Sequence, residues 1–86
     1  MLKYTSDTKE SIQLIKSNIN DLVGHIIVNK LDSELFILHS FSHGLNKFEN
    51  IDSATDFICV LAEKHTQHES DVILVIDHTN LLGKYL

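Results

Sequence analysis

The chain has 86 residues, 43% of them hydrophobic and 22% charged, which is the composition of one ordinary globular domain, 1–86. Its twelve Asp and Glu residues against seven Lys residues give a net charge of −5, and it contains no Arg and no Trp. Because Arg supplies the bidentate contacts to phosphate and guanine, and the Lys residues form no patch, this composition argues against nucleic acid as a partner.

A first helix is predicted to begin at residue 7. Asp7 and Glu10 have the spacing of a capping box, with Ser6 as the rival cap, and their charges suit the positive end of the helix dipole. Gly24 marks the predicted end of the helix. Between these limits, apolar residues recur at spacings of three and four and so share one face of the helix: Ile12, Ile15, Ile19 and Leu22.

Two strands are predicted at residues 25–31 and 34–41. The first is rich in β-branched residues, and both have the length of a strand. Asp32 and Ser33 lie between them and predict a hairpin turn. A loop is expected at residues 42–51.

A second helix is predicted over residues 53–67, where Ser53 and Asp56 again have the capping-box spacing. The apolar run at residues 71–77 predicts a last strand, followed by a short tail. The order helix, strand, strand, helix, strand therefore favours an α+β fold with two layers.

In this fold a small antiparallel or mixed sheet has both helices on one face. A short added strand at residues 1–5 would give a split βαβ, ferredoxin-like order. The alternative is a small all-α bundle, because residues 12–26 can also be read as one heptad-spaced helix in a chain without proline. The β-branched runs count against the bundle, since such residues lose side-chain freedom in a helix.

One side of the second helix is predicted to carry acidic residues around a small apolar centre. At about 100° per residue, five side chains point away from the apolar face of this helix: Asp52, Asp56, Cys59, Val60 and Glu63. We interpret them as candidate partner-binding residues for a protein with a basic surface. The alternative is a solvated helix face with a tolerated cysteine, and the acidic neighbours argue against a catalytic thiol.

Four histidines are weak candidates for metal ligands. His65 and His68 lie three residues apart, and His39 and His43 lie four apart. A zinc site needs three or four converging ligands, and either pair supplies only two. A histidine near a helix C-terminus is also favoured by the helix dipole, so we interpret His65 and His68 as a helix end and expect no cofactor.

Catalytic motifs are absent. The chain has no glycine-rich phosphate loop, no His-Glu-x-x-His and no Gly-x-Ser-x-Gly elbow, so we do not expect an enzyme. A small ligand-binding or enzymatic domain is kept as an alternative, with Asp77 and His78 as base and orienting group beside a pocket near the last strand.

The predicted strands are apolar on both sides of the pleat, although the two helices of the expected fold cover only one side. The other side would then exceed the apolar area that a soluble monomer usually exposes. We therefore expect self-association as a homodimer through an uncovered sheet face. The predicted self-association residues are Ile26, Val28, Phe36, Leu38, Ile73 and Val75.

Together these features favour a small acidic protein-interaction module that self-associates and binds and modulates or inhibits another protein. Its size and charge are typical of inhibitors, immunity proteins and proteins of mobile elements, which is an argument by association. The alternative is a metal- or pH-responsive module built on the histidines. No twenty-residue apolar run predicts contact with a membrane, and the single cysteine fits a reducing compartment, so the expected location is the cytoplasm.

Overall fold

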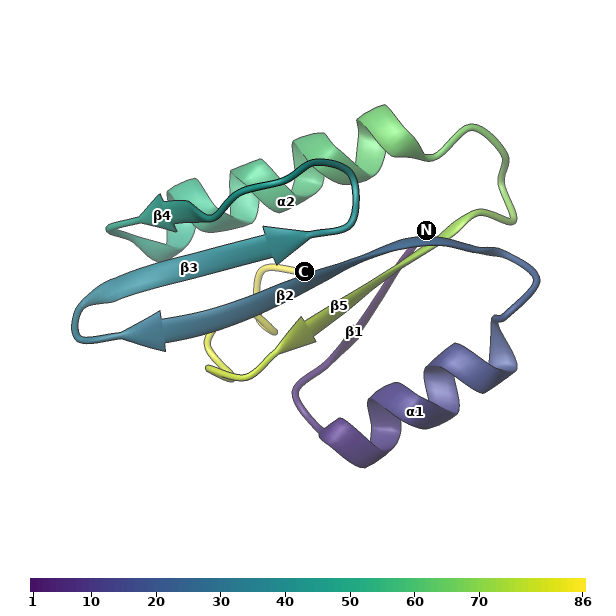
Figure 1. Cartoon of the computed structure of the whole chain (residues 1–86), viewed down its shortest axis with the longest axis horizontal. Helices are drawn as coiled ribbons and strands as arrows, with labels where there is room; N and C mark the ends of the chain where they lie inside the picture. The colour runs from purple at the N-terminus through teal and green to yellow at the C-terminus, as the bar shows by residue number, and fades with distance from the viewer.

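The computed structural model describes all of residues 1–86 and contains five strands and two helices (Figure 1). This arrangement confirms the α+β fold and the added N-terminal strand, and it rules out the all-α bundle. In chain order the elements are β1 (Leu2–Thr5), α1 (Thr8–Ser17), β2 (Leu22–Leu31), β3 (Glu34–His39), β4 (Asn46–Phe48), α2 (Ile51–His65) and β5 (Val72–Asp77).

The five strands form one mixed sheet in the order β1–β5–β2–β3–β4. Strand β5 lies between β1 and β2 and is parallel to both, whereas β2, β3 and β4 form an antiparallel meander. The expected loop at residues 42–51 contains β4, so the ferredoxin-like order is interrupted by an extra strand. A strand of three residues is too short to show alternation in the sequence.

The two helices lie on opposite faces of the sheet, so the expectation that both cover one face was wrong (Figure 1). Strands β1 and β2 are parallel, and so are β4 and β5, so each helix sits in a crossover between parallel strands. The first crossover runs across the sheet in one direction and the second runs back. Right-handed crossovers that run in opposite directions place their helices on opposite faces.

Helix α1 is shorter than predicted. Asp7 is its N-cap, as expected, and accepts a hydrogen bond from the backbone of Lys9. The helix ends at Ser17 because the side-chain amide of Asn18 donates to the Leu14 carbonyl at 2.8 Å and closes the last turn. Leu22 therefore belongs to β2.

Gly24 lies inside strand β2 and does not end a helix. A Cβ atom at this position would overlap the ring of Phe41. The glycine therefore leaves the space that the Phe41 ring occupies.

The β2–β3 hairpin forms where it was predicted. Its two-residue turn has Asp32 at a φ of 56°, and Leu31 pairs with Glu34 across it. Helix α2 begins earlier than predicted, because its N-cap is Asn50, which accepts from the Ser53 backbone at 2.8 Å. Neither helix is long and apolar enough to cross a membrane.

One hydrophobic core fills the space between the sheet and α2, and the C-terminal tail closes it with the buried Leu82. Helix α2 contributes Ala54, Ile58 and Leu61 to this core. The buried strand residues of the core are Ile26, Val28, Leu35, Ile37, Ile73 and Val75.

Candidate functional site

The predicted partner-binding side of α2 does face outward. Helix α2 packs its opposite side on the sheet, so the angular prediction placed these side chains correctly. The side-chain hydrogen bonds of this segment involve Asn50 and Thr66 and leave the carboxylates free for solvent or a partner. We call this surface the α2 outer face; it consists of the exposed residues Asp52, Asp56, Cys59, Val60 and Glu63.

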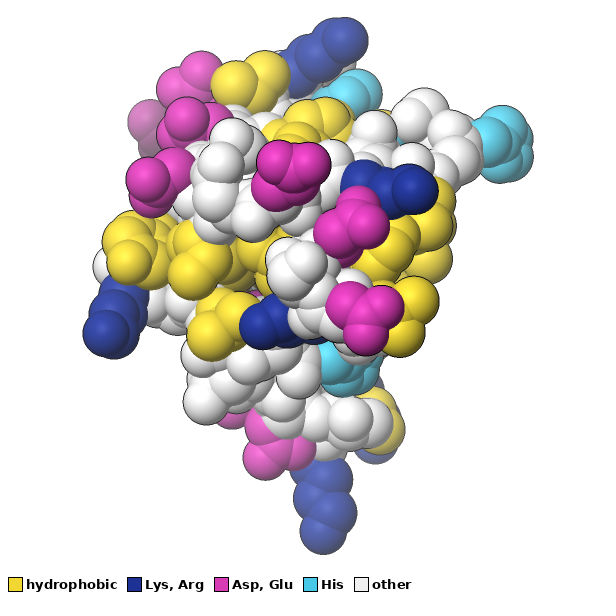
Figure 2. Space-filling model, turned by 90° about the vertical axis from the view of Figure 1, so that its left-hand side faces the viewer, with side chains coloured by type: hydrophobic (Ala, Val, Ile, Leu, Met, Phe, Trp, Pro, Cys, Tyr) yellow, Lys and Arg dark blue, Asp and Glu magenta, His cyan; other side chains and the backbone are white.

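The α2 outer face combines charge with apolar surface. Figure 2 looks onto the end of the molecule at which α2 begins, and Asp and Glu side chains (magenta) gather in its upper part, where α2 lies. A band of hydrophobic side chains (yellow) runs below them. Val60 exposes 61% of its surface between Asp56 and Glu63, which gives the acidic surface an apolar centre.

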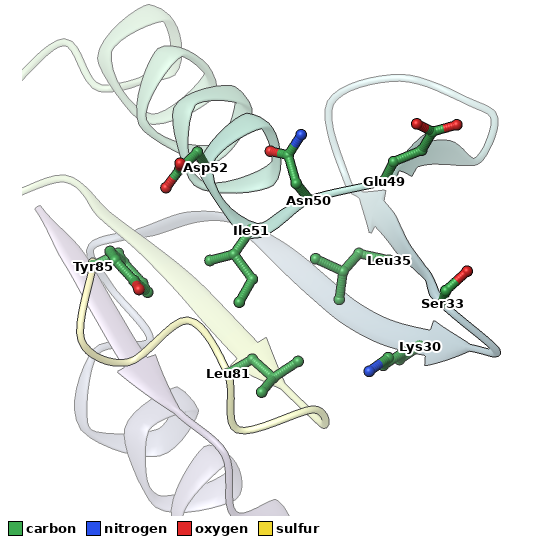
Figure 3. Close-up of a pocket in the computed structure, with 9 residues that line it drawn as sticks. All are labelled: Lys30, Ser33, Leu35, Glu49, Asn50, Ile51, Asp52, Leu81 and Tyr85. Atoms are coloured by element: carbon green, nitrogen blue, oxygen red, sulfur yellow. The ribbon is translucent and has the colours of Figure 1, made fainter.

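A hollow of about 440 Å³ adjoins the α2 outer face at the N-terminal end of α2 (Figure 3). Leu35, Ile51 and Leu81 point toward its middle and form an apolar floor. The polar and aromatic residues at its rim are Lys30, Ser33, Glu49, Asn50, Asp52 and Tyr85. We call these nine residues the α2 hollow.

Asp52 belongs to both the α2 hollow and the α2 outer face, so the two form one surface. The chemistry of this combined surface suits a long cationic side chain, because the aliphatic stem of a Lys or Arg can lie on apolar residues while its charged end meets a carboxylate. Asp52 supplies such a carboxylate, whereas the Glu49 carboxylate points away from the apolar floor in Figure 3, and Lys30 offsets part of the negative charge. The sequence prediction missed this hollow, since its residues come from three distant segments with no shared periodicity.

The four candidate histidines do not converge. His43 and His68 are exposed, whereas His39 and His65 are half-buried. No three His, Cys, Asp or Glu side chains are grouped so that they could hold a metal ion. The two predicted pairs therefore form no metal centre in this structure.

His39 and His65 instead belong to an aromatic cluster. The ring of Phe41 is stacked on His65, and His39 lies 5.8 Å from the ring centre of Phe57. Burial lowers the pKa of His39 below its ordinary value, and the charge of His65 lowers it further.

Asp77 is fully buried and holds the C-terminal tail on the sheet. Its carboxylate accepts hydrogen bonds from the Tyr4 hydroxyl at 2.8 Å, from the Leu82 backbone at 3.0 Å, and from both the backbone and the hydroxyl of Thr79. Burial alone would raise the pKa of Asp77, but these hydrogen bonds outweigh it and lower the pKa below its ordinary value. Burial, together with the hydrogen bond and charge of Asp77, raises the pKa of Tyr4 to about 12.

The alternative enzymatic site required a pocket lined by Asp77 and His78. None of the four cavities of the structure is lined by either residue. His78 is exposed, and its backbone donates to the Val28 carbonyl. The geometry gives Asp77 a structural role.

Four of the predicted self-association residues lie in the core. Ile26, Val28, Ile73 and Val75 have no exposed surface, because α2 and the tail cover their face of the sheet. Phe36 and Leu38 point to the other face, where Phe36 is half-buried and Leu38 is 48% exposed. The six predicted self-association residues therefore come from both faces of the sheet and do not form one surface.

Comparisons of the chain with family models, with curated proteins and with solved structures found no match. What the protein does must therefore be inferred from its own surfaces.

Proposed function

We propose that this chain is a small acidic protein-interaction module that binds a basic surface of another protein and thereby modulates or inhibits it. The observation that carries the proposal is the continuity of the α2 outer face with the α2 hollow through Asp52. Carboxylates beside exposed apolar side chains are suited to a partner that presents Lys or Arg next to apolar residues.

The charge of the chain supports the same proposal. A net charge of −5 steers a basic protein toward the molecule at low salt, and the apolar centre at Val60 supplies contact area that salt does not screen. We therefore expect partner association to slow as salt is raised, with a remaining affinity that depends on Val60.

The proposal is tested by charge reversal. The chain, attached to a resin, is used to capture proteins from extracts of its source, and a captured protein is then purified and titrated directly. Reversing Asp52, Asp56 and Glu63 to Lys should lower the affinity at least about tenfold, because each lost contact becomes a repulsion. The reference is a variant with the same change in net charge at three exposed acids elsewhere, namely Glu10, Asp21 and Glu69 reversed to Lys. Equal affinity of the two triple variants would refute the α2 outer face as the binding surface.

The pH-responsive alternative has one supporting observation, the cluster of His39, His65 and Phe41. Protonation of His39 would add charge beside the aromatic rings of Phe41 and Phe57. Its metal-responsive form has no cluster of ligands to support it.

A further inference from the structure

Helix α1 covers only half of its face of the sheet. It contacts β5 and β1, and no helix lies over β2 and β3 on that side. The uncovered half contains a groove of about 340 Å³ whose apolar lining is Ile27, Leu31, Phe36, Leu38 and Leu45. We call these five residues the β2–β3 back face.

The β2–β3 back face is strongly exposed for a set of apolar residues. Leu31 exposes 66% of its surface, Leu38 48% and Leu45 51%. Ile27 also lines a second hollow, which runs under α1 beside Ile15. The apolar surface is thus continuous from the side of α1 to the loop before β4, and burying it would be favourable.

Two opposite charges flank the centre of this surface. Phe36 pairs with Lys47 on the neighbouring strand β4, and paired residues of antiparallel strands point to the same side. Glu34 lies two residues before Phe36 on β3 and therefore also points to this side. Measured between backbone positions, Lys47 lies one strand away from Phe36, at about 4.8 Å, and Glu34 lies along the strand, at about 7 Å.

This arrangement is complementary to itself. Two sheets can pack face to face with their strands at right angles, related by a two-fold axis that passes beside Phe36. In this packing the strands of one copy run across the strands of the other copy. Glu34 of each copy then meets Lys47 of the other, and the two Phe36 rings meet at the axis. A basic partner would find no excess of negative charge here, since Lys30 also lines the groove beside Glu34 and Lys47.

We propose that the β2–β3 back face binds a second copy of this chain in a two-fold dimer, with two ion pairs between Glu34 and Lys47 around a Phe36 contact. The proposal goes beyond partner binding by α2, because it uses the opposite face of the sheet. The β2–β3 back face has five apolar residues, whereas a standard stable interface has roughly 20–30 residues per partner, so we expect a dimer that dissociates on dilution.

The test is the mass of the purified protein in chelator, measured by light scattering and sedimentation over a wide concentration range. The wild-type protein should change from monomer to dimer as its concentration rises. Leu38→Asp should weaken the dimer at least about tenfold, because it buries a carboxylate without a partner. Val60→Asp, the same kind of change at a more exposed position on the α2 outer face, should leave the mass unchanged.

The ion pairs are tested by charge swaps that leave the fold alone, since Lys47 is exposed and Glu34 is partly exposed. Glu34→Lys and Lys47→Glu should each weaken self-association about tenfold, because each change acts twice in a two-fold dimer. A mixture of the two variants should form a mixed dimer of near wild-type affinity, since each Lys then meets a Glu. Recovery of the affinity on mixing would show that the β2–β3 back face binds a second copy of this chain.

A wild-type protein that stays monomeric at millimolar concentration would overturn the proposal and leave the surface to a different protein. A dimer that is insensitive to Leu38→Asp, or charge-swapped variants that fail to recover on mixing, would also overturn it. These measurements use the purified chain alone, so their failure would not affect the proposed binding of a basic partner by α2.

Discussion

The ring of Phe41 lies flat on the imidazole of His65, with ring centres 3.9 Å apart and planes 6° from parallel. This contact joins the loop after β3 to the last turn of α2, and Gly24 of β2 leaves room for the same ring. Three segments that are far apart in the sequence therefore depend on one aromatic side chain.

The first prediction concerns this contact. Gly24→Ala should lower the free energy of unfolding by about 1–3 kcal/mol, because the new methyl group overlaps the Phe41 ring. In a Phe41→Ala background the same change should cost less than half as much, since the ring is gone. Urea unfolding followed by circular dichroism measures both values. Equal costs in the two backgrounds would show that the strain lies elsewhere, for example against the Ser40 hydroxyl.

The second prediction concerns pH. The pKa of His39 in the folded protein is below its ordinary value, so the unfolded chain takes up the proton first as the pH falls. The neutral imidazole therefore contributes fully to the free energy of unfolding above the ordinary histidine pKa of about 6.5. This contribution decreases as the pH falls below that value. His39→Gln should flatten the pH dependence of the urea midpoint, whereas the exposed His43→Gln should retain it. If the urea midpoint of both variants depends on pH as it does in the wild-type protein, His39 does not cause the loss of stability in acid.

The third prediction concerns the buried carboxylate. Asp77→Asn should lower the free energy of unfolding by about 2–4 kcal/mol, because an amide replaces an acceptor that serves several donors. The pKa of Asp77 is lowered in the folded state, so its contribution is present above the ordinary carboxyl pKa and is lost as the pH falls through the folded value. The wild-type protein should therefore lose stability in acid more steeply than the variant.

The matched variant is Asp71→Asn, whose carboxylate also accepts two backbone hydrogen bonds but at an exposed site. We expect Asp71→Asn to lower the free energy of unfolding less than Asp77→Asn does, because water can replace the lost hydrogen bonds at an exposed site. A cost for Asp77→Asn no larger than that of Asp71→Asn would contradict the anchoring role of Asp77.

The fourth prediction uses the single cysteine. Cys59 is exposed in the middle of the α2 outer face, so a bulky maleimide should react with it in the folded protein and leave the circular dichroism spectrum unchanged. The labelled chain should lose binding to its basic partner and keep its self-association, because the β2–β3 back face lies on the other side of the sheet. Cys59→Ser treated with the same reagent should bind normally. Labelled protein that binds its partner as well as the untreated protein would place the binding surface away from α2.

The local parts of this fold could be predicted from the sequence. The Asp7 cap, the hairpin turn at Asp32 and the apolar run at residues 71–77 are signals carried by neighbouring residues, and all three formed where they were predicted, although the first helix ends at Ser17 and not at Gly24. The outward side of α2 also followed from angle alone, because a helix keeps its period over four turns.

Which face of the sheet each helix covers could not be predicted in the same way. Alternation along a strand separates its two sides, but which side a helix covers depends on the strand order and on the direction of each crossover. The length of the hairpin turn does indicate which strand residues share a side. A two-residue turn pairs Leu31 with Glu34, so Phe36 and Leu38 must share a side with Ile27 and not with Ile26 or Val28.

The α2 hollow was missed for a different reason. Lys30, Glu49 and Tyr85 come from a strand end, a loop and the C-terminal tail, and only the packed chain brings them together. No local pattern could have predicted this grouping.

The position of β5 between β1 and β2 has a consequence for how the protein is made. The strand that completes the middle of the sheet is the last of the five to be synthesised, and until it emerges β1 has no neighbouring strand. A nascent chain on the ribosome can form the β2–β3 hairpin and both helices early, but it cannot close its sheet until residues 72–77 emerge. Until then the edges of β1 and β2 are open to chaperones and to misassembly, and a chain truncated before Val72 lacks the strand that joins β1 to the β2–β3–β4 meander.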